Sequence, residues 1–250
     1  MNKRGFIDAE TAAHVLPLGV FLLMLSVPDL LGLGADRAAP DAAWYVARPE
    51  HWLFPLQTIV CFALLVVFRR YYQFTPHTGW LLAAAAGAAA IVLWIAPGYL
   101  FESVQLGEGW WKYLGLAPRV DGFDPTFIKE SSETWYVAAV AMRMLRLVVL
   151  VPLVEEIFWR GFLMRYLVDP DGDFWKVPFG TFDRRSLVLV TAMFVIIHAP
   201  VDYLAAAIYG LLAYWIAVRT KSLSACVVMH ATANLLLGIY ILTTERWGYW

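Results

Sequence analysis

WLLAAAAGAAAIVLWIAPGYL, the run Trp80–Leu100, contains no charged side chain. An α-helix rises about 1.5 Å per residue, so about 20 apolar residues cross the roughly 30 Å hydrocarbon core of a bilayer. This run therefore predicts a transmembrane helix. The small residues from Ala83 to Ala90, with Gly87 among them, form a face on which a second helix can pack closely in lipid.

Further apolar runs lie on both sides of this segment. The chain of 250 residues is 61% hydrophobic and 16% charged, with a mean hydropathy of +0.62, which is far more apolar than soluble proteins are. Pro152, Pro200 and the stretch Arg219–Lys221 divide the second half into shorter runs. We expect an all-α fold, a polytopic transmembrane bundle of about eight apolar helices with a polar intramembrane cavity. Besides Trp80–Leu100, the predicted spans are Ala12–Leu33, Trp52–Phe68, Glu133–Val151, Leu153–Val168, Ser186–Ala199, Val201–Val218 and Ser222–Thr243.

The positive charges predict the orientation of the chain. Lysine and arginine recur on alternate loops, as the positive-inside rule requires of cytoplasmic loops, so we expect a cytoplasmic N-terminus. The charges before the first apolar run also fit a signal peptide, but the spans that follow favour a retained helix. The loops concerned carry Lys3 and Arg4, Arg69 and Arg70, Arg165, Lys176, Arg184 and Arg185, and Arg219 with Lys221.

Composition argues against several classes of protein. The net charge of −1, without a basic face, gives no reason to expect a nucleic-acid partner. Cys61 and Cys226 each lie in an apolar run, without a partner at metal-ligand or redox spacing, and we interpret both as core residues. No internal repeat is visible, which disfavours a transporter built from repeats.

The chain divides into two parts by content. Residues 1–130 hold the N-terminal transmembrane helices and a connecting aromatic loop, Glu108–Phe127, positioned to cover a cavity or lie on the membrane. Residues 131–250 form a membrane core that carries the polar motifs. We expect the two parts to make a single membrane domain.

The first motif places carboxylates inside an apolar helix. Residues 151–165 read VPLVEEIFWRGFLMR. An ionisable residue at membrane depth costs at least about 2.5–3.5 kcal/mol, so it needs a partner or a function. Glu156 and Arg160 are four apart and share a helical face, where they can form an ion pair. Glu155 points about a quarter-turn away and is our candidate general base, because a carboxylate beside a like charge in an apolar site takes up a proton readily.

Two further motifs supply imidazole and amide groups. FVIIH ends at His198, before Pro200, and HATAN sets His230 and Asn234 on one helical face. All of these groups lie inward from the predicted cytoplasmic loops, so they can converge in one water-filled cavity within the membrane. The alternative interpretation is structural: a buried ion-pair cluster at the glutamates and a polar clamp between helices at the histidines.

In this order the motifs EExxxR, FxxxH and HxxxN resemble the type II CAAX prenyl protease and bacteriocin-processing family of membrane peptidases, also called CPBP or Abi-like. The resemblance covers Glu133–Thr243. It implies an intramembrane endopeptidase in the bacterial inner (cytoplasmic) membrane. Its partners would be the lipid bilayer and a membrane-associated protein or peptide substrate, cleaved near its C-terminus, with a prenylated CAAX-type tail as one candidate.

The resemblance also implies roles for the motif residues. Glu155 and His198 would activate a water molecule, and His230 with Asn234 would stabilise the oxyanion of the tetrahedral intermediate. Glu156 and Arg160 would support this geometry. Amide hydrolysis needs these functions, a base for water, donors for the oxyanion and an acid for the leaving amine.

Several alternatives stay open from the residues alone. Glu155, His198 and His230 form a plausible zinc-binding set, although the HExxH spacing of common zinc peptidases is absent, and we favour a mechanism without metal or other cofactor. A non-catalytic membrane partner or a small transporter could also use the buried Glu, His and Arg residues. Ser186, Ser222 and Ser224 lie in no nucleophile motif, which argues against a serine peptidase.

Overall fold

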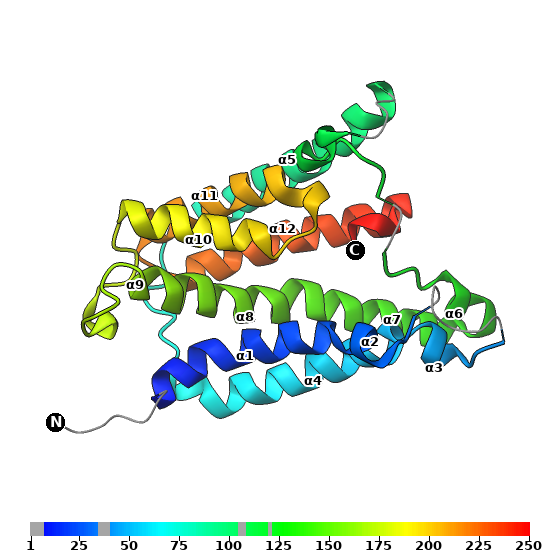
Figure 1. Ribbon diagram of the computed structural model, residues 1–250, viewed down its shortest axis with the longest axis horizontal. Helices are drawn as coiled ribbons and strands as arrows, with labels where there is room; N and C mark the ends of the chain where they lie inside the picture. The colour runs from blue at the N-terminus through cyan, green and yellow to red at the C-terminus, as the bar shows by residue number, and fades with distance from the viewer. Residues whose placement is uncertain (1–7, 35–40, 105–108, 120–121) are drawn as a thin grey trace. The chain divides into compact units, whose positions relative to one another are not determined.

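The computed structural model describes residues 8–34, 41–104, 109–119 and 122–250 (Figure 1). Within them the chain is helical and contains no strand, as expected. The chain forms two compact units. Unit 1 comprises Met1–Tyr72 and Phe123–Glu155, and unit 2 comprises Gln73–Gly122 and Glu156–Trp250.

The number of membrane-length helices is lower than predicted. Five helical segments in the described residues are long and apolar enough to cross a bilayer, so the expected count of about eight is not confirmed. The first predicted span is divided into α1 (Ala9–Leu25) and α2 (Val27–Leu31), and Ser186–Ala199 appears as the shorter α10 (Arg184–Ile196). The five segments are Glu50–Tyr71, Trp80–Val104, Glu133–Tyr166, Pro200–Thr220 and Leu223–Thr244.

Pro152 does not separate two helices, contrary to our prediction. The segment Glu133–Tyr166 is continuous through α7 (Glu133–Leu145), η3 (Arg146–Leu150), α8 (Val151–Glu156), η4 (Ile157–Leu163) and α9 (Met164–Tyr166). A proline clashes with the carbonyl four residues before it, here that of Val148. Val148 lies in η3, which is a π-helical turn, and this wider turn makes room for the proline ring.

Side-chain caps define where several helices begin. Asp8, Ser132, Asp183 and Ser222 precede α1, α7, α10 and α12 (Leu223–Thr244), and each accepts a hydrogen bond from a backbone N–H of the first turn. The remaining elements are α3 (Trp44–Ala47), α4 (Glu50–Phe68), η1 (Arg69–Tyr71), α5 (Trp80–Val104), η2 (Trp110–Leu114), α6 (Thr126–Ser131), η5 (Phe174–Lys176), η6 (Pro200–Asp202), α11 (Tyr203–Thr220) and η7 (Trp247–Tyr249).

In unit 1, α1 lies along α4 (Figure 1). Pro17 inside α1 lacks an N–H, so the carbonyl of Ala13, four residues earlier, loses its helical partner. The hydroxyl of Tyr72 donates to this carbonyl at 2.9 Å. A side chain from outside the helix therefore satisfies the group that the proline frees, as polar groups in lipid require.

Unit 1 also contains a buried polar network. Gln57 is fully buried, donates to the carbonyl of Phe21 at 2.6 Å and accepts from Nε of Arg146 at 2.7 Å. The Arg146 guanidinium lies over the rings of Phe21 and Phe54, at 4.7 and 4.5 Å from their centroids. These contacts explain how an arginine is accommodated in an apolar helix.

In unit 2, α5 lies along α12, and α10 lies along α11 (Figure 1). A Cβ added to Gly87 would collide with the backbone carbonyl of Met229. Ala83 and Ala90 are buried on the same helix. The small-residue face predicted for α5 is therefore confirmed as the surface on which α12 packs.

The predicted orientation rests partly on residues outside the described ones. Lys3 and Arg4 lie there, and so does Glu108 at the start of the aromatic loop. The described parts of that loop, residues 109–119 and 122–127, contain η2 and the start of α6. The cytoplasmic N-terminus remains a prediction.

Candidate active site

An ion pair lies at the centre of the site in unit 2. Glu156 and Arg160 are both fully buried, and Nη1 of Arg160 lies 3.2 Å from Oε1 of Glu156. The four-residue spacing predicted this pair. Because a buried charge without a partner is costly, the pair must form for this helix to remain packed.

His230 joins the same carboxylate oxygen from α12. Its Nδ1 lies 2.9 Å from Oε1 of Glu156, and its side chain is buried. With Glu156 ionised beside Arg160, the carboxylate accepts and Nδ1 of His230 carries the proton. Only Nε2 of His230 is then available to contact a substrate. This atom is a hydrogen-bond acceptor in the neutral ring and a donor in the imidazolium.

His198 follows the end of α10 and does not lie inside a helix. We predicted that the helix runs to Ala199, but α10 ends at Ile196, consistent with the bias against helical backbone before Pro200. Nδ1 of His198 lies 2.7 Å from the carbonyl oxygen of Phe194. A carbonyl only accepts, so Nδ1 carries the proton, and Nε2 of the neutral ring is free to act as a base.

Aromatic rings connect the two histidines. The Phe194 ring contacts His198 at a centroid distance of 4.5 Å and stacks on Tyr209 at 5.6 Å. Tyr209 in turn lies 5.2 Å from His230. Trp94 of α5 covers His198 at 5.7 Å. The structure thus brings His230, Glu156 and Arg160 into direct contact and attaches His198 to them through two rings.

Asn234 lies one turn beyond His230 on α12 and is half-buried. Residues four apart share a helical face, so the amide and the imidazole lie on the same side of α12. This agrees with the predicted arrangement of the HATAN motif. The role of Asn234 in oxyanion binding remains a prediction.

Glu155 is the last residue of unit 1, whereas the other five candidate residues belong to unit 2. Its side chain is 9% exposed, and its Oε2 makes no hydrogen bond with the described residues. A buried carboxylate oxygen without a donor is unusual and marks Glu155 as a candidate for function.

Metal binding was the alternative use of Glu155, His198 and His230. The described residues contain no group of three or more His, Cys, Asp or Glu side chains arranged to hold a metal ion. Each histidine keeps only Nε2 as a ligand atom, because its Nδ1 is hydrogen-bonded. The mechanism without a metal ion therefore remains a prediction.

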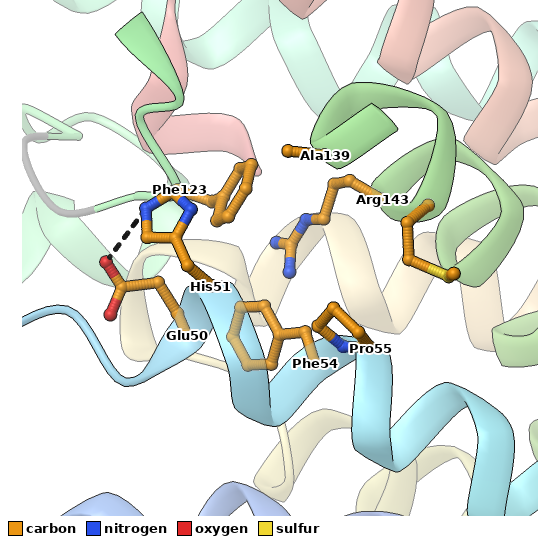
Figure 2. A pocket seen from close by; sticks show the side chains of 8 residues that line it. Glu50, His51, Phe54, Pro55, Phe123, Ala139 and Arg143 are labelled. Atoms are coloured by element: carbon orange, nitrogen blue, oxygen red, sulfur yellow. Dashed lines mark ion pairs between the residues drawn. The ribbon is translucent and has the colours of Figure 1, made fainter. Parts of the chain in front are cut away.

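A small pocket of unit 1 contains a different set of polar residues (Figure 2). His51 and Glu50 lie 3.5 Å apart, and the Arg143 guanidinium lies over the rings of Phe54 and Phe123. None of the motif residues lines this pocket of about 20 Å³. It is therefore not the predicted active site.

Sequence reasoning missed two features of the site. The π-helical turns η3 and η4 flank the glutamate pair, and such turns occur frequently at functional sites. Tyr209 also went unnoticed, because an aromatic residue in an apolar helix looks like any other packing residue. No pattern in the sequence distinguishes either feature.

Part of the chain matches a known protein family. Residues 137–236 match the family described as type II CAAX prenyl endopeptidase Rce1-like, and this range contains all six motif residues. The resemblance predicted from the three motifs is confirmed over this range. None of the curated proteins or solved structures that were compared matches the chain. Together with its five membrane-length helices, the match indicates an integral membrane protein.

Proposed function

We propose, on the premise of this family match, that the protein is an intramembrane endopeptidase. It would hydrolyse a peptide bond near the C-terminus of a membrane-associated protein, with a prenylated CAAX-type tail as the first substrate to test. The observation that carries the proposal is the single buried oxygen of Glu156 that holds both Arg160 and His230. Through this oxygen, the EExxxR motif and the HxxxN motif form one polar site.

In the proposed reaction, Glu155 and His198 activate a water molecule. One water proton passes to Glu155, and the water oxygen attacks the carbonyl carbon of the substrate. The tetrahedral intermediate then collapses, the C–N bond breaks, and the proton held by Glu155 passes to the leaving nitrogen. The Phe194 carbonyl fixes the tautomer of His198, so that Nε2 can accept a hydrogen bond from the water.

His230 and Asn234 are the proposed donors to the oxyanion. For His230 this role requires a proton on Nε2 as well as on Nδ1, that is, an imidazolium. The Glu156 carboxylate accepts the hydrogen bond from Nδ1 and so holds the ring in position. Glu156 would therefore orient the proposed donor, in addition to neutralising Arg160.

We further propose that the reaction needs no metal and that the protein lies in a bacterial inner membrane with its N-terminus in the cytoplasm. The metal-free mechanism is supported by the motif spacing, which lacks the HExxH pattern of common zinc peptidases. The orientation is supported by the arginine and lysine residues on alternate loops.

The test is peptide cleavage by the purified protein in liposomes. Two peptides of one CAAX-type sequence, prenylated and unprenylated, are incubated with and without a chelator and analysed by mass spectrometry. Cleavage of the prenylated peptide that resists chelation supports the proposal. Cleavage that chelation abolishes and zinc restores would establish the metal-dependent alternative, and absence of cleavage of both peptides would contradict the CAAX-type substrate.

A further inference from the structure

A larger cavity lies in unit 2 where α5 and α12 end. It has a volume of about 390 Å³ and contains none of the motif residues. Its walls come from the end of α5, the loop before residue 119 and the segment that follows α12. The residues used below are Gly98, Glu102, Arg119, Glu245, Arg246 and Tyr249.

Arg119 is the buried cation of this cavity. Its side chain is 8% exposed, and Nη2 contacts Oδ1 of Asp202 at 2.5 Å. The guanidinium lies over the Tyr249 ring at 4.3 Å. Its Nε is buried and makes no hydrogen bond with the described residues. A donor on a buried arginine that lines a cavity is suited to an anionic group of a ligand.

Two carboxylates, Glu102 and Glu245, also line this cavity. Glu245 is exposed, follows the last residue of α12, and forms no ion pair with the described part of the chain. Glu102 is already paired with Arg246, at 2.7 Å. The cavity therefore offers the unused Nε–H donor of a buried, ion-paired arginine and an exposed carboxylate that has no ion pair within the described residues.

The cavity wall is closely packed at two glycines. A Cβ at Gly98 would collide with the hydroxyl of Tyr249, and a Cβ at Gly248 would collide with the backbone of Arg119. Burial raises the pKa of the Tyr249 phenol, which therefore stays neutral at physiological pH. These contacts hold Arg119 and Tyr249 in fixed positions beside the cavity.

We propose that this cavity binds a phosphoethanolamine group, with the phosphate at Arg119 and the ammonium at Glu245. The phosphate would accept a hydrogen bond from Nε of Arg119, and the ammonium would meet the Glu245 carboxylate, whereas inorganic phosphate would leave Glu245 without a partner. The two helices that end here are of membrane length, and the neighbouring Tyr99 and Leu100 expose apolar surface on which an acyl chain can lie. A phospholipid headgroup is thus one source of this group, and a soluble phosphoethanolamine is the other. The inference goes beyond the proposed peptidase function and does not depend on it.

The experiment measures binding to the full-length, delipidated protein by native mass spectrometry. The ligands are short-chain phosphatidylethanolamine, phosphatidylcholine and phosphatidylglycerol, soluble phosphoethanolamine, and inorganic phosphate. We expect the ethanolamine lipid to bind about fivefold more tightly than phosphatidylglycerol, which is the size of an exposed charged pair. It should also bind more tightly than phosphatidylcholine, whose trimethylammonium carries the same charge but cannot donate a hydrogen bond to Glu245. Glu245→Gln should remove this preference, and its matched control Glu130→Gln should not.

A second variant tests the phosphate end of the site. Arg119→Gln combined with Asp202→Asn removes the ion pair without leaving a buried charge, and should weaken all three lipids alike, whereas Arg185→Gln should not. If the double variant fails to fold, the Glu245→Gln result still tests the proposal.

A displacement experiment distinguishes the two sources of the phosphoethanolamine group. If soluble phosphoethanolamine displaces the lipid, the headgroup alone is sufficient for binding; if it does not, the ligand is the whole lipid. Equal affinity for the three lipids, a preference that survives Glu245→Gln, or inorganic phosphate binding as tightly as phosphoethanolamine would overturn the proposal.

Discussion

Nδ1 of His230 lies 2.9 Å from Oε1 of Glu156, the same oxygen that lies 3.2 Å from Nη1 of Arg160. One buried carboxylate oxygen thus serves two motifs that are 74 residues apart in the sequence. Glu156 neutralises a buried arginine and also fixes the tautomer of a histidine. Stability and the proposed chemistry therefore depend on the same side chain.

Glu156→Gln should destabilise the protein and abolish cleavage. The amide cannot neutralise Arg160, and an uncompensated buried charge costs about 3 kcal/mol or more. We expect a lower unfolding temperature in detergent. The double variant Glu156→Gln with Arg160→Gln removes both charges and should recover stability while remaining inactive. An unfolding temperature equal to that of the unmodified protein in the single variant would show that Glu156 is not ionised in this pair.

His198→Ala should reduce the rate of cleavage without unfolding the protein. His198 is half-buried and lies in the turn after α10, so its removal leaves the helices intact. Loss of a group that assists proton transfer lowers kcat by about 100-fold or more. Steady-state kinetics measure this change. His77→Ala, which removes an exposed histidine of the same unit, should keep normal activity. Normal kinetics for His198→Ala would exclude His198 from the mechanism.

Tyr72→Phe should destabilise unit 1 without affecting the active site. The change removes the hydroxyl that satisfies the Ala13 carbonyl freed by Pro17, at a cost of about 1 kcal/mol. Thermal unfolding measures it. Tyr71→Phe is the matched control, since the Tyr71 hydroxyl accepts a hydrogen bond from the exposed Arg70. Equal unfolding temperatures for the two variants would argue against a structural role for this hydroxyl.

Gly87→Val should loosen the contact between α5 and α12. The added side chain would meet the Met229 carbonyl, and overpacking of this kind costs about 1–3 kcal/mol. Ala85→Val places the same side chain on an exposed position of α5 and serves as the control. We expect only the first variant to lower the unfolding temperature. A stable Gly87→Val protein would mean that the two helices pack less closely than described.

The lengths of the apolar stretches in the sequence predicted most of the helices, because a membrane-spanning helix must match the thickness of the bilayer. Trp80–Leu100 and Ser222–Thr243 correspond to α5 and α12 within a few residues at each end. The prediction failed at Pro152, where a π-helical turn absorbs the proline. The spacing of apolar residues does not reveal such a turn, so the continuous segment could not be foreseen.

The sequence predicted the individual motif residues of the candidate site but not the contacts between residues on different helices. Spacing along one helix predicted the Glu156–Arg160 pair, because residues four apart are neighbours on a helix. The contact of His230 with Glu156 depends on how two helices pack, which no local pattern encodes. For the same reason the sequence did not show that Tyr209 lies between His230 and Phe194.

The most direct test of the proposed hydrolysis is the cleavage rate of the Glu155→Gln protein in liposomes. The amide preserves the shape of the side chain and removes the base, and Glu130→Gln, on the exposed end of α6, controls for the loss of one charge. We expect Glu155→Gln to insert and fold normally but to release no cleaved peptide, while Glu130→Gln cleaves at the normal rate. Normal cleavage by Glu155→Gln would contradict the proposal that this carboxylate activates the water.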